Sequence, residues 1–268
     1  MLILTDRGIE IDDNGYIEKY ELESELVHLH SKISFEAIEL NNNIYSLYDK
    51  IKSPREDNLA NFYLGTLERM HKDYQAILIL LFRGMQSQAR SIMRNLLEKI
   101  LIMKAVDNDH KNFESWVRTQ NRERNRTIQI VKDGYTHHTE NEISKMNLEM
   151  SDDTEYVKYV EWAERADMVF DYKVIYHILC GDTHHTMSGI GKDTFEEEGM
   201  VAGFSIAPVF EDIDIIISLA MHYLLMTVLI INKYLGIDVG WTATLEKKLD
   251  DFGIEVMAEM AKESGRVF

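Results

Sequence analysis

The sequence predicts an all-α fold, a multi-helix bundle of long antiparallel helices with a small N-terminal β-hairpin or arm. Only two prolines, Pro54 and Pro208, occur in 268 residues. Proline breaks helix interiors, so this scarcity leaves room for long helices. Apolar residues also recur at spacings of three, four and seven along most of the chain, which is the period of a helix face. A chain of this length can bury a sizeable core without disulfide bonds.

The N-terminal residues differ from the rest of the chain. Residues 2–17 have the pattern of short strands, with turn sequences at Asp6–Gly8 and at Asn14–Gly15. Asn-Gly is a strong signal for a tight hairpin turn. We therefore expect an arm or hairpin over 1–17 and a single helical domain over 18–268.

Two helices are predicted next, over about 18–52 and from the following cap to about Phe82. Ser53 has the character of a helix cap, Pro54 fits the first turn, and Glu56 lies three residues after the cap. The short connection between the two stripes implies an antiparallel helical hairpin.

The remaining helices are predicted by apolar periodicity and by capping patterns. The sequence Ser151-Asp152-Asp153 is expected to cap a helix that runs to about Asp167. Residues 186–208 show little periodicity and are expected to be a long non-helical segment, of a kind that is often functional. The other predicted helices cover about 86–106, 111–132, a short stretch after the capping box 139–142, 172–182, 209–235 and 242–262.

Composition limits the location and the partners. A single cysteine, Cys180, cannot form an intramolecular disulfide, which favours a reducing compartment, and residues 1–7 do not have the pattern of a signal peptide. Residues 215–231 are almost continuously apolar, but Asp214 and His222 favour a core helix over a membrane span. We expect a cytoplasmic protein without a membrane anchor. The net charge of −17 repels phosphate backbones, so RNA binding would need a local basic patch.

Arg90, Arg94 and Glu98 follow one another at intervals of four residues. At about 100° per residue they share one side of their predicted helix, beside its apolar face. Two interpretations stay open: a structural ladder of ion pairs with a modest effect on stability, or charged groups at a functional site.

A second group of polar residues ends the predicted helix 172–182. If that helix continues, Tyr176, Cys180 and His184 stack on one face. Histidine titrates near neutral pH, so His184 suits proton transfer. The alternative is a helix-end histidine that interacts with terminal carbonyl groups.

Metal binding is the less favoured use of the same run. The ligands would be His177, Asp182, His184 and His185. However, the chain has no second cysteine and no His-Glu-x-x-His, so the usual zinc spacings are not met. It also lacks a glycine-rich phosphate loop and a dinucleotide fingerprint. We predict neither a metal nor a cofactor.

The clearest basic stripe comprises Arg118, Arg122 and Arg126, which are also spaced by four residues. Together with Arg90, these side chains are candidates for binding nucleic acid or another anionic ligand. They could equally pair with acidic side chains of neighbouring helices, since the chain contains 46 Asp and Glu residues.

Residues 88–98 and 176–184 resemble the signature of a large bacterial family of helical proteins that is catalogued only as a domain of unknown function. The family pattern is Arg-x-x-x-Glu in an early helix and Tyr-x-x-x-Ser-x-x-x-His in a later one. Arg94 and Glu98 match the first element, and Tyr176 and His184 match the second, with Cys180 in place of the usual serine. The similarity covers roughly residues 60–235.

That family is similar in outline to the HEPN superfamily, many members of which are metal-independent ribonucleases of toxin–antitoxin and antiphage systems. The resemblance implies a ribonuclease or toxin that acts on RNA and has a cognate protein or antitoxin as partner. Arg94 would stabilise the developing phosphorane charge, and His184 would move a proton. Glu98 would orient Arg94, and Tyr176 would hydrogen-bond His184 or the substrate. The HEPN hallmark itself, an Arg followed after four to six residues by His, does not occur here.

Two alternatives to catalysis stay open. In a non-catalytic interaction module, Arg94, Glu98 and His184 would form a buried polar network that fixes the bundle. In a small-ligand or nucleotide sensor, the same cluster would bind the ligand, with residues 186–208 as a lid. A homodimer is expected in each case, because helical proteins with exposed apolar stripes commonly pair.

Overall fold

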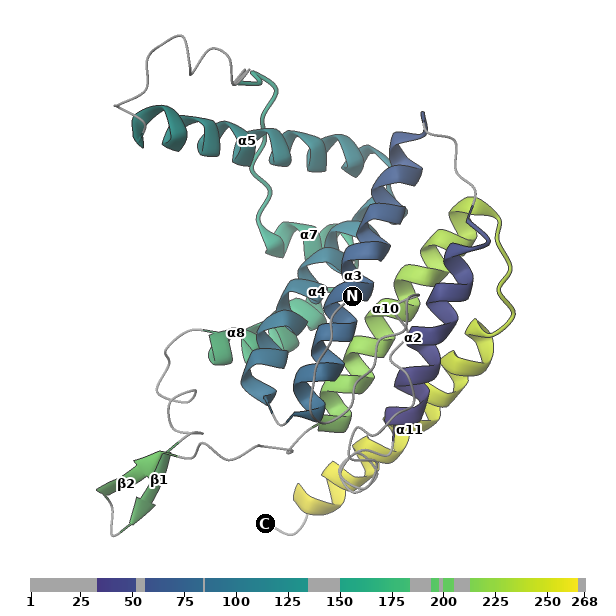
Figure 1. Ribbon diagram of the computed structural model, residues 1–268, viewed down its shortest axis with the longest axis vertical. Coiled ribbons are helices and arrows are strands. Elements are labelled where there is room, and N and C mark those ends of the chain that lie inside the picture. The colour runs from purple at the N-terminus through teal and green to yellow at the C-terminus, as the bar shows by residue number, and fades with distance from the viewer. Residues whose placement is uncertain are drawn as a thin grey trace, which may run out of the picture. The chain divides into compact units, whose positions relative to one another are not determined.

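The computed structural model describes residues 33–51, 56–83, 85–134, 150–183, 194–197, 200–204 and 213–264. This part of the chain is helical apart from one two-stranded hairpin, so the all-α part of the predicted fold class is confirmed (Figure 1). The predicted arm over 1–17 and the short helix after 139–142 lie outside the described residues. The chain divides into two compact units: the described residues up to Ile100 together with those from Lys173, and Leu101–Tyr172. The single domain over 18–268 stays a prediction.

The first unit is built around α10 (Ile213–Leu235), which packs against α3 (Asn58–Phe82), α2 (Ser34–Tyr48) and α11 (Thr242–Ser264) (Figure 1). Among the described residues, α10 is the helix that is long and apolar enough to cross a membrane. Most of its residues are buried inside the structure, which is also the pattern of a core helix in a soluble protein.

Helices α2 and α3 form the predicted antiparallel pair. The Tyr74 hydroxyl donates to the carbonyl oxygen of Ala37 at 2.8 Å. The start of α3 differs from the prediction: Asp57, not Ser53, is the cap residue, and its Oδ1 accepts from the Ala60 amide at 2.9 Å. Asp57 also accepts from the Tyr234 hydroxyl of α10 at 3.1 Å, a tertiary contact that favours the later start.

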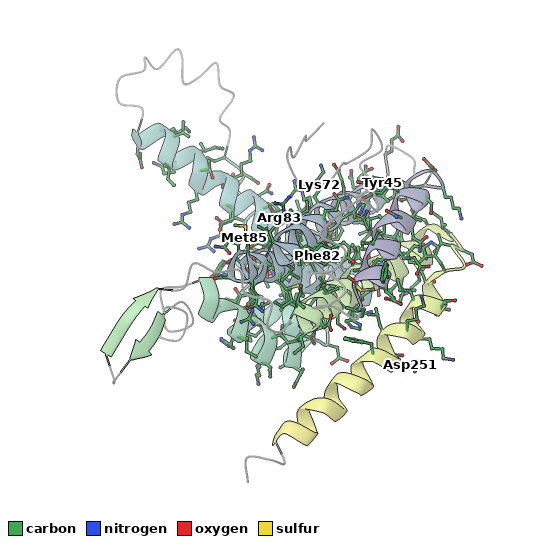
Figure 2. The ribbon with its side chains drawn as sticks, turned by 60° about the horizontal axis from the view of Figure 1, so that its bottom comes forward. Tyr45, Lys72, Phe82, Arg83, Met85 and Asp251 are labelled. Atoms are coloured by element: carbon green, nitrogen blue, oxygen red, sulfur yellow. The ribbon has the colours of Figure 1, made fainter. Side chains whose placement is uncertain are left out.

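A polar network lies inside this pair of helices. The ring of His71 is bonded on both sides, to Asn41 Oδ1 at 2.9 Å through Nε2 and to the Tyr48 hydroxyl at 3.3 Å through Nδ1. Gln75 Nε2 donates to Asn41 Oδ1 at 3.0 Å and to the hydroxyl of Tyr45, which is labelled in Figure 2, at 2.8 Å. Asn41 Oδ1 can only accept, so His71 Nε2 carries the proton and Nδ1 accepts from Tyr48. Burial disfavours the charged ring and lowers the pKa of His71 to about 4.

The connection between α10 and α11 is set by glycine. Gly236 follows the last residue of α10 at φ +66°, a left-handed conformation that favours glycine. The Ile237 amide then donates back to the carbonyl oxygen of Asn232 at 3.0 Å, as in a Schellman motif. This stop allows α11 to return along α10, where its residues Leu245 and Leu249 are buried.

In the second unit, α5 (Lys111–Gly134) follows α4 (Gln86–Asn108), close to the predicted boundaries. The predicted helix over 151–167 is wrong in its first half, because residues 152–158 are not helical and α7 covers only Tyr159–Arg165. Instead, Asn125 of α5 binds Ser151 twice, donating to its carbonyl oxygen at 2.7 Å and accepting from its amide at 2.9 Å. These bonds from α5 satisfy both backbone polar groups of Ser151.

The predicted helix over 172–182 also differs from the structure. A π-helical segment, η1 (Asp171–Tyr176), leads into α8 (His177–Thr183), so the run is not one regular α-helix. Tyr176 is buried, whereas Val174 and Ile178 on either side of it are exposed. Of the predicted non-helical stretch 186–208, the structure describes two strands. β1 (Thr194–Glu197) and β2 (Met200–Phe204) are not helical and pair in antiparallel fashion.

Candidate functional site

The first half of α4 carries the predicted Arg/Glu stripe. It begins just after the junction marked by Phe82, Arg83 and Met85 in Figure 2. Arg90 is buried, with 8% of its surface exposed. The side chains of Arg94 and Glu98 keep 25% and 16% of their surface exposed. Arg94 Nε donates to Glu98 Oε1 at 3.1 Å, as expected for residues one helical turn apart. The shared face is therefore confirmed, with Arg90 inside the core and the other two at its edge.

Tyr176 from η1 completes a triangle with Arg94 and Glu98. Its hydroxyl accepts from Arg94 Nη2 at 3.0 Å and donates to Glu98 Oε1 at 2.9 Å. The Arg94 guanidinium carbon also lies 5.0 Å from the centroid of the Tyr176 ring, within range of a cation–π interaction. The structure thus joins two stretches of sequence that are about 80 residues apart.

The protonation states of the triangle support each other. Burial alone lowers the pKa of the Arg94 guanidinium, but the Tyr176 hydrogen bond and the electrostatic interactions with Tyr176, Cys180 and Glu98 outweigh it, so this pKa is raised. Burial first, and then the hydrogen bond and charge of Glu98, raise the pKa of Tyr176 to about 12. At neutral pH Arg94 is a cation and Tyr176 is a neutral phenol, as the observed donor pattern requires.

Cys180 lies one turn after Tyr176 on α8 and is half-buried. It is near enough to Arg94 to act on the charge of the guanidinium. Arg94, Glu98 and Tyr176, three residues of the two predicted motifs, therefore belong to one cluster. His184, the last motif residue, follows Thr183 directly in the sequence but lies outside the described residues, as does His185.

The metal alternative involves few described residues. His177 is exposed at the start of α8, and Asp182 lies within α8. No group of three or more His, Cys, Asp or Glu residues within the described ranges is arranged to hold a metal ion.

The three arginines of the basic stripe on α5 have different surroundings in the second unit. Arg118 is an internal partner: it binds Glu155 Oε2 at 2.9 Å and the Ser115 hydroxyl at 3.2 Å. Arg122 is exposed and its guanidinium carbon lies 4.1 Å from the centroid of the Tyr156 ring. Arg126 is exposed on the same helix. The alternative of acidic partners thus holds for Arg118, while Arg122 and Arg126 face solvent.

Sequence reasoning missed several partners in these clusters. Nothing in the local sequence indicates that Glu155 and Tyr156 lie against α5, because these contacts join residues more than 30 positions apart. The resemblance paired Tyr176 with His184 or substrate, and its bonds to Arg94 and Glu98 were not foreseen. The only available signal was the resemblance, which places these residues in one expected pattern.

Replacing Tyr176 by phenylalanine should lower the free energy of unfolding by about 1–2 kcal/mol, since it removes the hydroxyl that bridges Arg94 and Glu98 but keeps the ring. Urea denaturation measures the change. Tyr156→Phe is the matched control, because Tyr156 is 57% exposed, and its effect should stay below about 0.5 kcal/mol. Equal losses in the two variants would show that the Tyr176 hydroxyl has no special role in stability.

Comparison with known proteins gives one family. Residues 61–201 match a family described as "Family of unknown function (DUF5677)". The match begins in α3, ends in β2 and contains both motif elements. No curated protein and no solved structure matches the chain.

Proposed function

The chain belongs to DUF5677, a family of unknown function, and we propose that it is an endoribonuclease whose site contains Arg94, Glu98, Tyr176 and His184. The observation that carries the proposal is the Arg94–Glu98–Tyr176 triangle, which brings the two motif elements into one cluster. Buried charge with specific partners is typical of functional sites, although structural networks also show it.

In the proposed reaction, Arg94 binds the scissile phosphate and stabilises the charge that develops on it. The guanidinium is held by Glu98 and Tyr176, so its orientation is set before a substrate arrives. A quarter of the Arg94 side chain remains exposed, which leaves it accessible to an anion. His184 transfers a proton at the ribose 2′-hydroxyl or at the leaving oxygen.

The proposed site differs from the HEPN hallmark in its construction. The arginine comes from α4, and the histidine follows α8, instead of both coming from one helix. The bond between Arg94 and Tyr176 supports this two-helix arrangement, because it joins the arginine helix to η1, the segment that leads into α8. On the surface, the exposed Arg122 and Arg126 are the proposed RNA contacts of α5.

The second candidate is a non-catalytic interaction module. It is favoured by one observation: Glu98 Oε1 accepts from both Arg94 and Tyr176, so these three groups satisfy one another. A satisfied network of this kind can specify packing without any chemistry. In that case substitutions in the cluster change stability alone, and the protein cleaves no RNA.

The biological setting is proposed with the activity. We place the protein in the bacterial cytoplasm, in an antiphage or toxin–antitoxin system, with a cognate protein or antitoxin as its partner. A homodimer is part of the proposal, because Phe35, Met85 and Ile178 are apolar and exposed on the first unit.

RNA cleavage is expected to survive EDTA and to fall about a hundredfold in the His184→Ala protein, because general acid–base catalysis contributes about 10²–10⁴-fold. The assay uses metal-stripped protein and a mixed pool of tRNA and mRNA. His222→Ala is the control, since His222 is exposed on α10. Loss of cleavage on adding EDTA, with recovery on adding a metal, would overturn the metal-independent mechanism. A native-like His184→Ala protein with full activity would remove His184 from it.

A further inference from the structure

Tyr156 is a large aromatic residue whose side chain faces solvent in the second unit. It is 57% exposed, whereas Val157, the next residue, is buried. The Arg122 guanidinium carbon lies 4.1 Å from the centroid of the Tyr156 ring, so the guanidinium covers one face of that ring. Solvent reaches more than half of the residue in spite of this contact. A ring with a cation on one face and solvent around the rest can stack on a second flat group.

The backbone that carries Tyr156 is fixed against α5. The Glu155 amide donates to the carbonyl oxygen of Arg118 at 3.3 Å, and Glu155 Oε2 accepts from Arg118 Nε at 2.9 Å. Two residues earlier, the carbonyl oxygen of Asp153 accepts from Asn121 Nδ2 at 3.1 Å. The residues just before the ring are thus held through both backbone and side-chain atoms. Because the ring is presented in a fixed place, little freedom is lost when a ligand stacks on it.

Positive charge lies beside this ring. Arg122 and Arg126 are both exposed and lie one helical turn apart on α5, about 6 Å along the helix axis. Neither of them forms a salt bridge with another described residue. The acidic side chains of Asp153 and Glu155 face Arg118 instead, which offsets their charge. Two arginines and an exposed ring therefore form a small site for a ligand that is both flat and anionic.

An unpaired nucleotide carries this combination of groups. Its base is a flat ring system, and its phosphate is an anion. Aromatic side chains stack on unpaired bases with little dependence on sequence, because every base has a π-face. In a duplex the bases are paired and stacked on one another, so their faces do not meet a surface ring.

We infer that Tyr156 is a base-stacking residue for single-stranded RNA. The base lies on the face of the ring opposite Arg122, and the adjoining phosphates lie on Arg122 and Arg126. The inference rests on the proposed function for the identity of the ligand. It adds a requirement for unpaired RNA and a contact residue in the second unit, Leu101–Tyr172, that binds the substrate and takes no part in the chemistry.

Binding is measured by fluorescence anisotropy with a labelled 2′-O-methyl RNA of about twelve nucleotides, within the site sizes of single-strand binding surfaces. The methyl groups block cleavage through the 2′-hydroxyl, so binding is measured separately from cleavage. The dissociation constant should rise about tenfold in Tyr156→Ala and stay within about threefold of the wild type in Tyr156→Phe, which keeps the ring. The matched control is Ile130→Ala, which removes an exposed apolar side chain from α5 and should bind as the wild type does.

Two further measurements separate stacking from charge. The slope of the logarithm of the binding constant against the logarithm of the salt concentration should lose about 0.7 in Arg122→Ala and in Arg126→Ala, the value for one phosphate of a single strand. A fully paired duplex of the same sequence should bind the wild type and Tyr156→Ala equally, because its bases are not available for stacking.

Equal affinities of the wild type and Tyr156→Ala for the single strand would overturn the inference, and RNA cleavage by the same proteins would leave the ribonuclease proposal standing. Equal losses for the single strand and the duplex would also overturn it, because stacking would not explain them. Binding that depends on Tyr156 in a protein that cleaves no RNA would support the stacking site and remove the ribonuclease proposal. A wild type that binds neither probe would overturn the inference and leave a protein partner as the occupant of this surface.

Discussion

Replacing Arg94 by alanine is expected to lower the rate of RNA cleavage about 10³-fold, the upper range for removing one preorganised donor to a developing charge. Arg94 is the cation of the triangle, and its bonds to Glu98 and Tyr176 aim it before any substrate binds. Its loss also leaves the Glu98 carboxylate half-buried with Tyr176 as its remaining described donor. The rate is measured on a labelled RNA, with the melting temperature recorded in parallel to separate chemistry from folding.

Arg94→Lys distinguishes charge from geometry in this experiment. Lysine keeps the positive charge but lacks the planar fork, so it cannot bind Glu98 and Tyr176 as Arg94 does. An intermediate loss, about tenfold to a hundredfold, is expected for this variant. Arg83→Ala, which removes an exposed arginine at the end of α3, should retain full activity. If Arg94→Ala instead cleaves at the wild-type rate while its melting temperature falls, the triangle is a structural network.

The stability of the protein should fall by about 2.5 kcal/mol more than that of a His71→Gln variant between pH 7 and pH 4.5. The pKa of His71 is lowered to about 4 in the folded protein and is about 6.5 in the unfolded chain. Between these values the unfolded state binds more protons, so this contribution is fully present above pH 6.5 and is lost as the pH falls towards 4. Each pH unit inside this window costs about 1.4 kcal/mol.

His71→Gln isolates this effect from the titration of the acidic residues. Glutamine does not titrate, and its amide can donate to Asn41 as the His71 ring does. The free energy of unfolding is measured with urea at each pH for both proteins. The difference between the two curves should change by about 2.5 kcal/mol between pH 7 and pH 4.5, with the wild type losing more stability as the pH falls. Parallel curves would mean that burial does not hold the His71 ring neutral.

Local patterns predicted the helices whose boundaries depend on nearby residues. The apolar stripes gave α4 and α5 to within about two residues, and the spacing of Arg94 and Glu98 gave their shared face. The two cap predictions failed where distant partners compete. Asp57, which Tyr234 of α10 contacts, caps α3 in place of Ser53. Ser151 is held by Asn125 of α5, and the residues that follow it are not helical. Local sequence patterns do not indicate such long-range contacts.

The individual residues of the candidate site could be predicted from the sequence, but the contacts between its two segments could not. Helix geometry explains the Arg94–Glu98 pair, but no periodicity connects this pair to Tyr176. The family pattern grouped these residues, and the geometry then supplied the physical link. The π-helical turn could not be predicted from the sequence either, because its residues 171–176 have the same types as those of an ordinary α-helix.

The π-helical turn η1 determines how this region tolerates changes in length. A π-turn holds one more residue than the α-turn it replaces, because its backbone bonds run from residue i to i+5. Removing a single residue from Asp171–Val174 can therefore be absorbed by a return to α-helix, which leaves Tyr176 in place beside Arg94. The same deletion inside α8 cannot be absorbed in this way, because α8 is already an α-helix. It rotates every later side chain by about 100° around the helix axis. Length variation should thus be confined to the few positions before Tyr176, where the helix can gain or lose a residue without moving the cluster.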